Sequence, residues 1–307
     1  MTSYVGNAFY CFADSTSMLL AGIGENISSS RIEVVTGAGL GALWIADAKL
    51  IYFSNKSPDT GIGEALKLLG FEYVQKSRPK TEPAPLEELR VDLARFPVVL
   101  GPLDMGYLRY IPQSEPGVDH FVLAYAMDED EIHVHDPGGF PHVSLSLDQL
   151  ELAWKAERIG YGRDYYQYWT SPRRTHHLTE GQVYDRALEC FRSGYQQTDD
   201  RAGGQSWMTG HEAILACANH VREGKVAPPG VRHMVGFAFR LGAARALDFA
   251  AFFDFRDAAL ATLKRRQAKL FGRCHTLAVR EEWFSLADTL QELAGVEEKF
   301  RASLFAC

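Results

Sequence analysis

The pattern of hydrophobic residues changes near residue 170, and this change limits the fold more than any other feature of the sequence. Upstream, short apolar runs alternate with Gly and Pro: RIEVVTG, KLIYFS, FEYV, FPVVLGPL, HFVLAYAM and EIHVHDP. Such runs are typical of β-strands. Downstream, long segments carry apolar residues at intervals of three and four, which predicts amphipathic helices. The sequence therefore predicts an α+β domain over residues 1–170 with an antiparallel sheet, followed by an all-helical domain over residues 171–307.

The size and charge of the chain restrict its partners. With 307 residues, 46% of them hydrophobic, the chain is longer than most single cores, so two domains are expected. A net charge of −7 disfavours nucleic-acid binding, which needs clustered Lys and Arg, and favours a neutral or cationic small partner. The run MLLAGIG is too short for a membrane span or a secretory signal. We expect a cytoplasmic protein without a membrane partner.

The five cysteines predict free thiols. They lie at positions 11, 190, 217, 274 and 307, and no two of them form a Cys-x-x-Cys pair. Their odd number and wide spacing favour neither a disulfide framework nor a cysteine zinc site. Cys190, Cys217 and Cys274 fall in apolar patterns of helical spacing, so we expect them to be small buried residues.

Cys11 stands apart because it begins a predicted helix, in the stretch YCFADSTSMLL. Met18, Leu19 and Ile23 fall on one side of that helix. A thiol at the positive end of a helix dipole is favoured as thiolate, the form that acts as a nucleophile. The position alone is equally compatible with a core cysteine, so the nucleophile hypothesis requires a base.

The stretch Asp119 to Gly139 supplies a candidate base. It is predicted to form a β-hairpin with an acidic turn, MDEDE, that places His120 opposite or nearly opposite Asp136. Asp136 could then accept the Nδ1 proton of the imidazole and leave Nε2 to act on the thiol of Cys11. A strand histidine and an aspartate in an Asp-Pro-Gly-Gly turn are the alternative interpretations of the two residues. Taken together, the three residues predict a Cys, His, Asp triad.

The same motifs carry a family resemblance. Cys11 seven residues before Met18, His-Phe-Val at 120–122 and an Asp-Pro at 136 resemble the papain-like bacteriocin-leader peptidases. VVTGAGLGALW and VVLGPLDMGYLRY instead resemble the butirosin-biosynthesis H protein family, as do AARALDFAAFF and REEWFSLADTL. This resemblance is strong to residue 155 and looser beyond it. It implies a papain-like N-terminal domain and a helical C-terminal domain.

The resemblance also implies an activity. The namesake of that family is an acyltransferase that moves an aminoacyl group from a carrier-protein thioester to an aminoglycoside amine, in antibiotic biosynthesis. Its cysteine, histidine and aspartate fall on Cys11, His120 and Asp136. Peptidases of this fold usually carry an oxyanion glutamine about six residues before the cysteine, where this chain has Val5. Either Asn7 or the backbone N–H of Cys11 together with another donor could take its place, and the missing glutamine argues against proteolysis.

The predicted reaction is acyl transfer through a Cys11 acyl-enzyme, from a phosphopantetheine thioester to a small amine. Thiol exchange is nearly isoenergetic, so no cofactor or metal is expected. The helical domain would shape the acceptor pocket and exclude water. Asp14, Tyr107, Arg109 and Tyr110 are candidate substrate-binding residues by motif position.

The first expected partner is an acyl carrier protein, which the basic stretch RRTHH at 173–177 would bind. The apolar surface of the predicted helices also suggests a homodimer. Thioester cyclisation, peptide cleavage and a non-catalytic binding module with a papain-like cleft are the alternatives.

Three other motifs are weaker. The glycines of Gly37-Ala-Gly39-Leu-Gly41 follow the run IEVV as in a dinucleotide-binding loop, but the next segment is short for a helix and a second strand. His133 and His135 share a strand face without an obvious third metal ligand. His211-Glu212 would need a histidine at 215 for a zincin helix, and that residue is Leu215.

Overall fold

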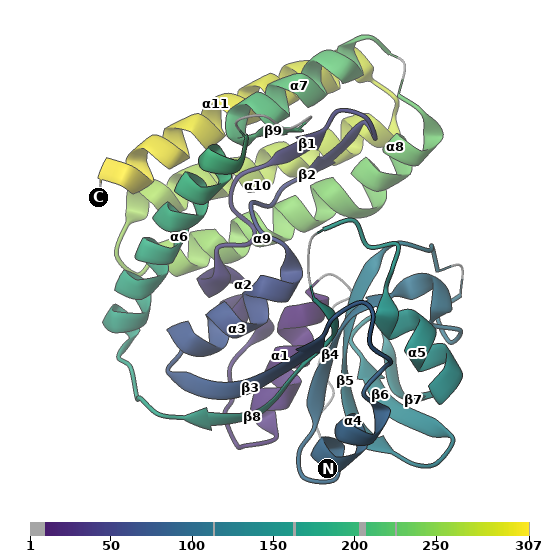
Figure 1. Ribbon diagram of the computed structural model, residues 1–307. Helices are drawn as coiled ribbons and strands as arrows, with labels where there is room; N and C mark the ends of the chain where they lie inside the picture. The colour runs from purple at the N-terminus through teal and green to yellow at the C-terminus, as the bar shows by residue number, and fades with distance from the viewer. Residues whose placement is uncertain (1–9, 113, 162–163, 203–206, 225, 307) are drawn as a thin grey trace. The chain divides into compact units, whose positions relative to one another are not determined.

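The computed structural model describes residues 10–112, 114–161, 164–202, 207–224 and 226–306, without the side chains of residues 199–202. The chain forms two compact units. Unit 1 comprises Met1–Glu33 and Ser57–Val183, and unit 2 comprises Val34–Lys56 and Tyr184–Cys307. Each unit therefore contains two separate stretches of chain (Figure 1).

Unit 1 is built on an antiparallel sheet of six strands in the order β3-β8-β4-β5-β6-β7. The strands are β3 (Phe71–Arg78), β4 (Val98–Asp104), β5 (Asp119–Met127), β6 (Glu131–Asp136), β7 (Phe140–Ser146) and β8 (Tyr165–Arg174). Strands β5 and β6 form the expected hairpin, and in its turn Asp128 Oδ1 accepts hydrogen bonds from the backbone N–H groups of Asp130 and Glu131. An aspartate that caps its own turn in this way explains why the acidic stretch ends the strand.

Unit 1 also contains helices. They are α1 (Cys11–Ala21), α2 (Ser29–Thr36, whose last three residues belong to unit 2), α3 (Pro58–Leu68), α4 (Leu86–Leu93), the 3₁₀ turn η1 (Met105–Tyr107) and α5 (Leu147–Lys155). Leu89 of α4 and Trp154 of α5 pack in one apolar cluster with Val122 of β5. Adjacent strand residues point to opposite faces, and Phe121 accordingly meets Phe12 of α1, with ring centroids 6.4 Å apart. The sheet thus separates α1 from α4 and α5.

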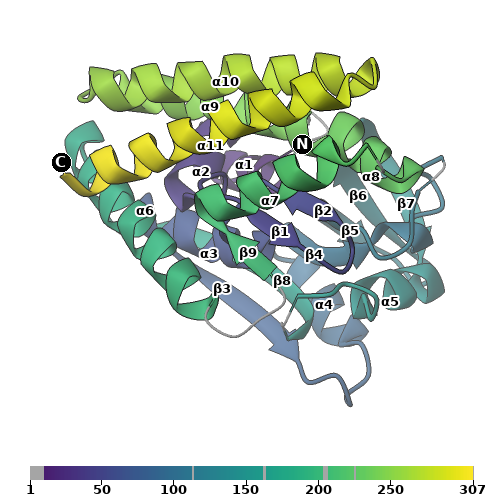
Figure 2. The same cartoon turned by 90° about the horizontal axis from the view of Figure 1, so that it is seen from above.

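Unit 2 is mainly helical. Its helices are α6 (Glu180–Ala202, begun in unit 1), α7 (Gly210–Arg222), α8 (Pro228–His233), the π-helical turn η2 (Met234–Ala238), α9 (Phe239–Phe253), α10 (Ala258–Val279) and α11 (Trp283–Ala306). Helix α10 packs against α9 and α11, and α11 packs against α7 (Figure 2). Three short strands form a second sheet in the order β2-β1-β9: β1 (Leu43–Ile45), β2 (Leu50–Tyr52) and β9 (Trp207–Thr209).

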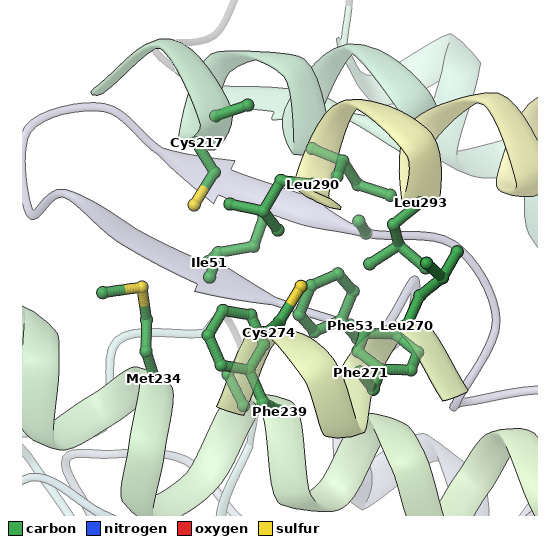
Figure 3. Packing of buried hydrophobic residues seen from close by; sticks show 14 of the residues in the cluster. Ile51, Phe53, Cys217, Met234, Phe239, Leu270, Phe271, Cys274, Leu290 and Leu293 are labelled. Carbon is green, nitrogen blue, oxygen red and sulfur yellow. The ribbon is translucent and has the colours of Figure 1, made fainter. Parts of the chain in front are cut away.

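The β1-β2 hairpin forms part of the core of unit 2. Ile51 and Phe53 are buried among side chains of the helices, with the Phe53 and Phe271 ring centroids 4.5 Å apart (Figure 3). Cys217 and Cys274 lie in the same cluster and are fully covered. Both cysteines are the small core residues that the sequence predicts.

The domain division differs from the predicted one in two ways. The units separate at residues 183 and 184 rather than at 170, because β8 continues to Arg174 as a strand of the large sheet. Residues 34–56 belong to unit 2, and with β9 they give it a sheet, so the expectation of an all-helical C-terminal domain is wrong. Apolar alternation identifies a hairpin in the sequence but not the core against which it packs.

One expected strand is a helix. The run RIEVVTG lies largely in α2, where Val34 and Val35 are buried. Burial of β-branched residues outweighs their modest preference for strands. A dinucleotide-binding loop requires a strand before its glycines, so this finding removes the alternative at 37–41.

Candidate active site

Cys11 is the first residue of α1, as the sequence predicts. The helix begins there because the Tyr10 carbonyl accepts a hydrogen bond from the Asp14 N–H at 2.7 Å. The helix is buried from Phe12 to Leu20, whereas Cys11 is partly exposed. The thiol therefore lies at the positive end of a helix dipole and at the edge of a packed core.

His120 and Asp136 come together on the β5-β6 hairpin. Leu123 pairs with His135, which places Asp136 beside Val122 and makes His120 its diagonal neighbour. The two side chains reach across this diagonal, with His120 Nε2 2.7 Å from Asp136 Oδ1. His120 is 6% exposed and Asp136 fully buried, so the contact is shielded from water.

The ring nitrogens have roles opposite to those predicted. The carboxylate is bonded to Nε2, so the hydrogen bond between His120 and Cys11 falls on Nδ1. The order thiol, imidazole, carboxylate is the predicted one.

Two further groups hold Asp136. The Tyr110 hydroxyl donates to Asp136 Oδ2 at 2.9 Å, and the Gly138 N–H donates to Oδ1 at 2.6 Å. A Cβ atom on Gly138 would lie 2.9 Å from the same oxygen, so the turn requires glycine at this position. With His120 as the third partner, the buried carboxylate has the hydrogen bonds that an ionised group needs.

The electrostatics of the pair follow from burial and from these contacts. Burial raises the pKa of the Cys11 thiol, and the hydrogen bond and charge of His120 oppose this rise. Burial alone would lower the pKa of His120, but its hydrogen bonds to Asp136 and Cys11 and their charges raise it to about 10. The imidazole and the thiol are therefore coupled through their hydrogen bond and their charges, and they titrate as a pair.

Carboxylates surround this pair. The charge of Asp119, the residue before His120, contributes to the raised pKa of Cys11. Burial raises the pKa of Asp119, and the charge of Asp59, at the start of α3, adds to this rise. Asp59 is 8% exposed, and in the described part of the chain its Oδ1 has no hydrogen-bond partner. The surroundings of the thiol are acidic and can attract a cation.

The remaining candidates from the sequence lie in different settings. Asp14 is buried in the first turn of α1, while Tyr110 reaches the site through Asp136. Tyr107 packs against the guanidinium of Arg158, 5.8 Å from its ring centroid, and Arg109 is exposed. Asn7, the oxyanion candidate, lies outside the described residues.

Both arginines of the basic stretch at 173–177 form ion pairs. Arg173 pairs with Glu72 at 2.5 Å, and Arg174 forms an ion pair with Glu25 while its guanidinium stacks on the Phe71 ring. These glutamates come from other parts of the chain, so local charge counting misses them. The role of this stretch as a surface for an acidic carrier protein stays a prediction.

The histidines of β6 are engaged by neighbours. His133 Nε2 lies 3.0 Å from Asp128 Oδ2, and His135 Nδ1 accepts from the His142 N–H at 3.2 Å. Over the residues that the structure covers, no cluster of three or more His, Cys, Asp or Glu side chains is arranged to hold a metal ion. None of the described helices has the length and hydropathy of a membrane span.

Ser15 is a site residue that the sequence interpretation misses. Its hydroxyl donates to the Phe121 carbonyl at 3.2 Å, and the Phe121 backbone also bonds to Cys11. Residues 11 and 15 are one helical turn apart, so α1 is fastened to β5 beside His120. This spacing is the signal that could have identified Ser15.

Comparisons with known proteins place the chain in a family. Residues 204–305 match the YobF C-terminal domain. A protein of Bacillus subtilis (strain 168), named "Uncharacterized protein YobF", is 41% identical over 308 residues, which cover 99% of this chain and 98% of that protein. The similarity thus spans both units. On this evidence the chain belongs to the YobF family.

Proposed function

We propose that this protein is a cysteine-dependent acyltransferase, in which Cys11 takes an acyl or aminoacyl group from a thioester and passes it to an amine. The observation that carries the proposal is the chain of contacts from the partly exposed Cys11 through His120 to the buried Asp136. A nucleophile, a base and a carboxylate that orients the base are the parts that covalent catalysis requires.

The reaction has two steps. In the first, the Cys11 thiolate attacks the thioester carbonyl, and imidazolium His120 returns the proton to the departing thiol. In the second, the amine attacks the acyl-enzyme, His120 takes its proton, and Cys11 leaves as thiolate. Cys11 is the first residue of α1, so its N–H has no acceptor within the helix and would be the donor to the oxyanion. Ionised Asp136 stabilises the imidazolium that forms in both steps.

The acidic surroundings of Cys11 favour a cationic acceptor. Asp119 and Asp59 lie near enough for their charges to affect one another, and Asp59 keeps an oxygen without a hydrogen-bond partner in the described chain. A polyamine or an aminosugar carries several ammonium groups that could bind there while one neutral amine attacks. The net charge of −7 supports the same class of acceptor.

The arrangement also supports a papain-like interpretation of unit 1. A cysteine at the start of a buried helix and a histidine on an antiparallel sheet are the features that the sequence resemblance implies. We extend that resemblance to the butirosin-biosynthesis H proteins, and with it a role in natural-product biosynthesis with a carrier-bound or coenzyme-A-type donor. The paired state of Arg173 and Arg174 favours the small donor.

The test is intact-mass spectrometry of the protein after incubation with acyl thioesters. The donors are acyl-coenzyme A, acyl cysteamine thioesters and an acylated carrier protein, and spermidine and an aminoglycoside serve as acceptors. The buffer is held near pH 8.5, because the raised pKa of Cys11 delays loss of the thiol proton. Cys190→Ala is the matched control for Cys11→Ala, because both thiols are partly exposed.

We expect an acyl adduct on the wild type and on Cys190→Ala, absent from Cys11→Ala, and its discharge by the amines faster than by water. An adduct that persists in Cys11→Ala would contradict the assigned nucleophile. Absence of an adduct with every donor would reject acyl transfer and favour a binding module. Discharge by water at the same rate as by the amines would favour a hydrolase.

A further inference from the structure

A second thiol lies in a setting unlike that of the buried cysteines. Burial raises the pKa of Cys217 to about 12 and raises that of Cys274 as well, so both remain inert thiols. Cys190, on α6 in unit 2, is partly exposed. Its sulfur lies 3.2 Å from the Nζ atom of Lys56, at the end of the stretch Val34–Lys56.

The contact between Lys56 and Cys190 is held in place by a shared acceptor. The Thr36 carbonyl accepts hydrogen bonds from Lys56 Nζ at 3.0 Å and from Cys190 Sγ at 3.6 Å. Gly194, one helical turn after Cys190, makes room for the lysine, since a Cβ atom there would lie 3.2 Å from Lys56 Cε. Amine, thiol and carbonyl thus form a compact triangle in which nitrogen and sulfur are already neighbours.

This geometry fits a known reaction of cysteine. Thiols beside lysines are those that peroxides oxidise first, and the resulting sulfenic acid condenses with a nearby nitrogen or thiol. Lys56 Nζ lies 3.2 Å from the Cys190 sulfur. The neighbouring nucleophile on hand is therefore the amine.

We propose that Lys56 and Cys190 form an oxidant-dependent covalent crosslink, a sulfenamide between Nζ and Sγ. Hydrogen peroxide first oxidises the thiol to sulfenic acid and is itself reduced, releasing one water. The neutral lysine amine then attacks the sulfur, so the S–N bond forms, the S–O bond breaks, and the leaving oxygen departs with a nitrogen proton as a second water. The thiol and the amine each lose one hydrogen, and a thiol reductant reverses the reaction.

The crosslink would join the two stretches of chain that form unit 2 by a covalent bond. The chain leaves unit 2 after Lys56 and returns to it at Tyr184, so a bond from Lys56 to Cys190 closes a loop that contains all of Ser57–Val183. Closure of a long loop restricts the unfolded chain strongly. The oxidised protein should therefore resist unfolding more than the reduced protein.

The experiment treats the protein with hydrogen peroxide near pH 8.5 and analyses the products by intact mass and peptide mapping. We expect the loss of two hydrogens, about 2 Da, with the peptides of Lys56 and Cys190 linked, and recovery of both on reduction with dithiothreitol. Peptide mapping of the wild type alone identifies the linked residues, so the result does not depend on how any variant folds.

Three variants sharpen the assignment. Cys190→Ser and Lys56→Arg should abolish the linked peptide, while Lys49→Arg, a change of the same kind in the same stretch, should retain it. Conversion of Cys190 to sulfinic acid with an unmodified Lys56 peptide would overturn the proposal. A linked peptide that survives Lys56→Arg, or a disulfide of Cys190 in place of the link, would overturn it as well.

Discussion

Both units contain a buried carboxylate that accepts a hydrogen bond from a tyrosine, but the two networks end differently. In unit 1, Asp136 accepts from Tyr110 and His120, and the histidine leads to the partly exposed thiol of Cys11. In unit 2, Glu297 accepts from Tyr195 and Gln267. Gln267 accepts from Lys264 at 2.9 Å, and Lys264 Nζ lies 3.8 Å from the Phe300 ring centroid.

The difference shows that a buried polar network acquires a chemical role from the group at its end. The network of Glu297 ends on an aromatic ring and a cavity of only about 10 Å³, about the size of one water, lined in part by Lys264 and Glu297. The network of Asp136 ends on a nucleophile. We therefore expect the first to contribute to stability and the second to reactivity.

The largest expected effect concerns the rate at which Cys11 accepts an acyl group. His120→Ala should slow acylation by on the order of 10²–10⁴, the usual contribution of a positioned base. Lys264→Met should leave the rate within about twofold, because its network does not include the thiol. Adduct formation followed by quenched mass spectrometry gives both rates. Equal losses in the two variants would contradict the division of roles.

The next effect concerns the stability of unit 2. Glu297→Gln should lower the free energy of unfolding by about 3–5 kcal/mol, since it leaves Lys264 buried without its counter-charge. Glu292→Gln, on the same helix, breaks only the exposed ion pair with Arg266 and should cost about 0–1 kcal/mol. Urea unfolding followed by circular dichroism measures both. Similar costs for the two changes would show that the buried carboxylate is not needed.

The smallest effect is a pair of opposite pH dependences. The pKa of His120 rises from 6.5 to about 10 on folding, so its stabilising contribution is complete below pH 6.5 and is lost as the pH rises through 10. Burial lowers the pKa of Lys264 from 10.5 to about 8, although the charge of Glu297 opposes this. The contribution of Lys264 is therefore complete above pH 10.5 and is lost as the pH falls through 8.

Unfolding free energies near pH 7 and pH 9.5 measure these slopes. The stability advantage of the wild type over His120→Gln should shrink with rising pH, whereas its advantage over Lys264→Met should grow. If both stability differences changed with pH in the same direction, the two networks would not have the opposite pH dependences expected here.

The spacing of apolar and turn residues predicts the elements that carry the site residues, but not the contacts between those residues. The helix at Cys11 and the hairpin that carries His120 and Asp136 follow from apolar spacing and from turn residues. The diagonal placement of His120 and Asp136 depends on the pairing of Leu123 with His135, a register that the sequence does not display. The partners of Arg174 and the helix over RIEVVTG depend likewise on distant packing.

The small sheet of unit 2 has a consequence for how the protein is made. Its β1-β2 hairpin leaves the ribosome before all of Ser57–Val183, whereas the helices that cover Ile51 and Phe53 are completed only near the end of synthesis. At about 5–20 residues per second, this delay is on the order of tens of seconds. During that interval the apolar side chains of the hairpin have no core to enter. Exposed apolar strands of this kind favour aggregation, so the period of synthesis is when this hairpin is most exposed to it.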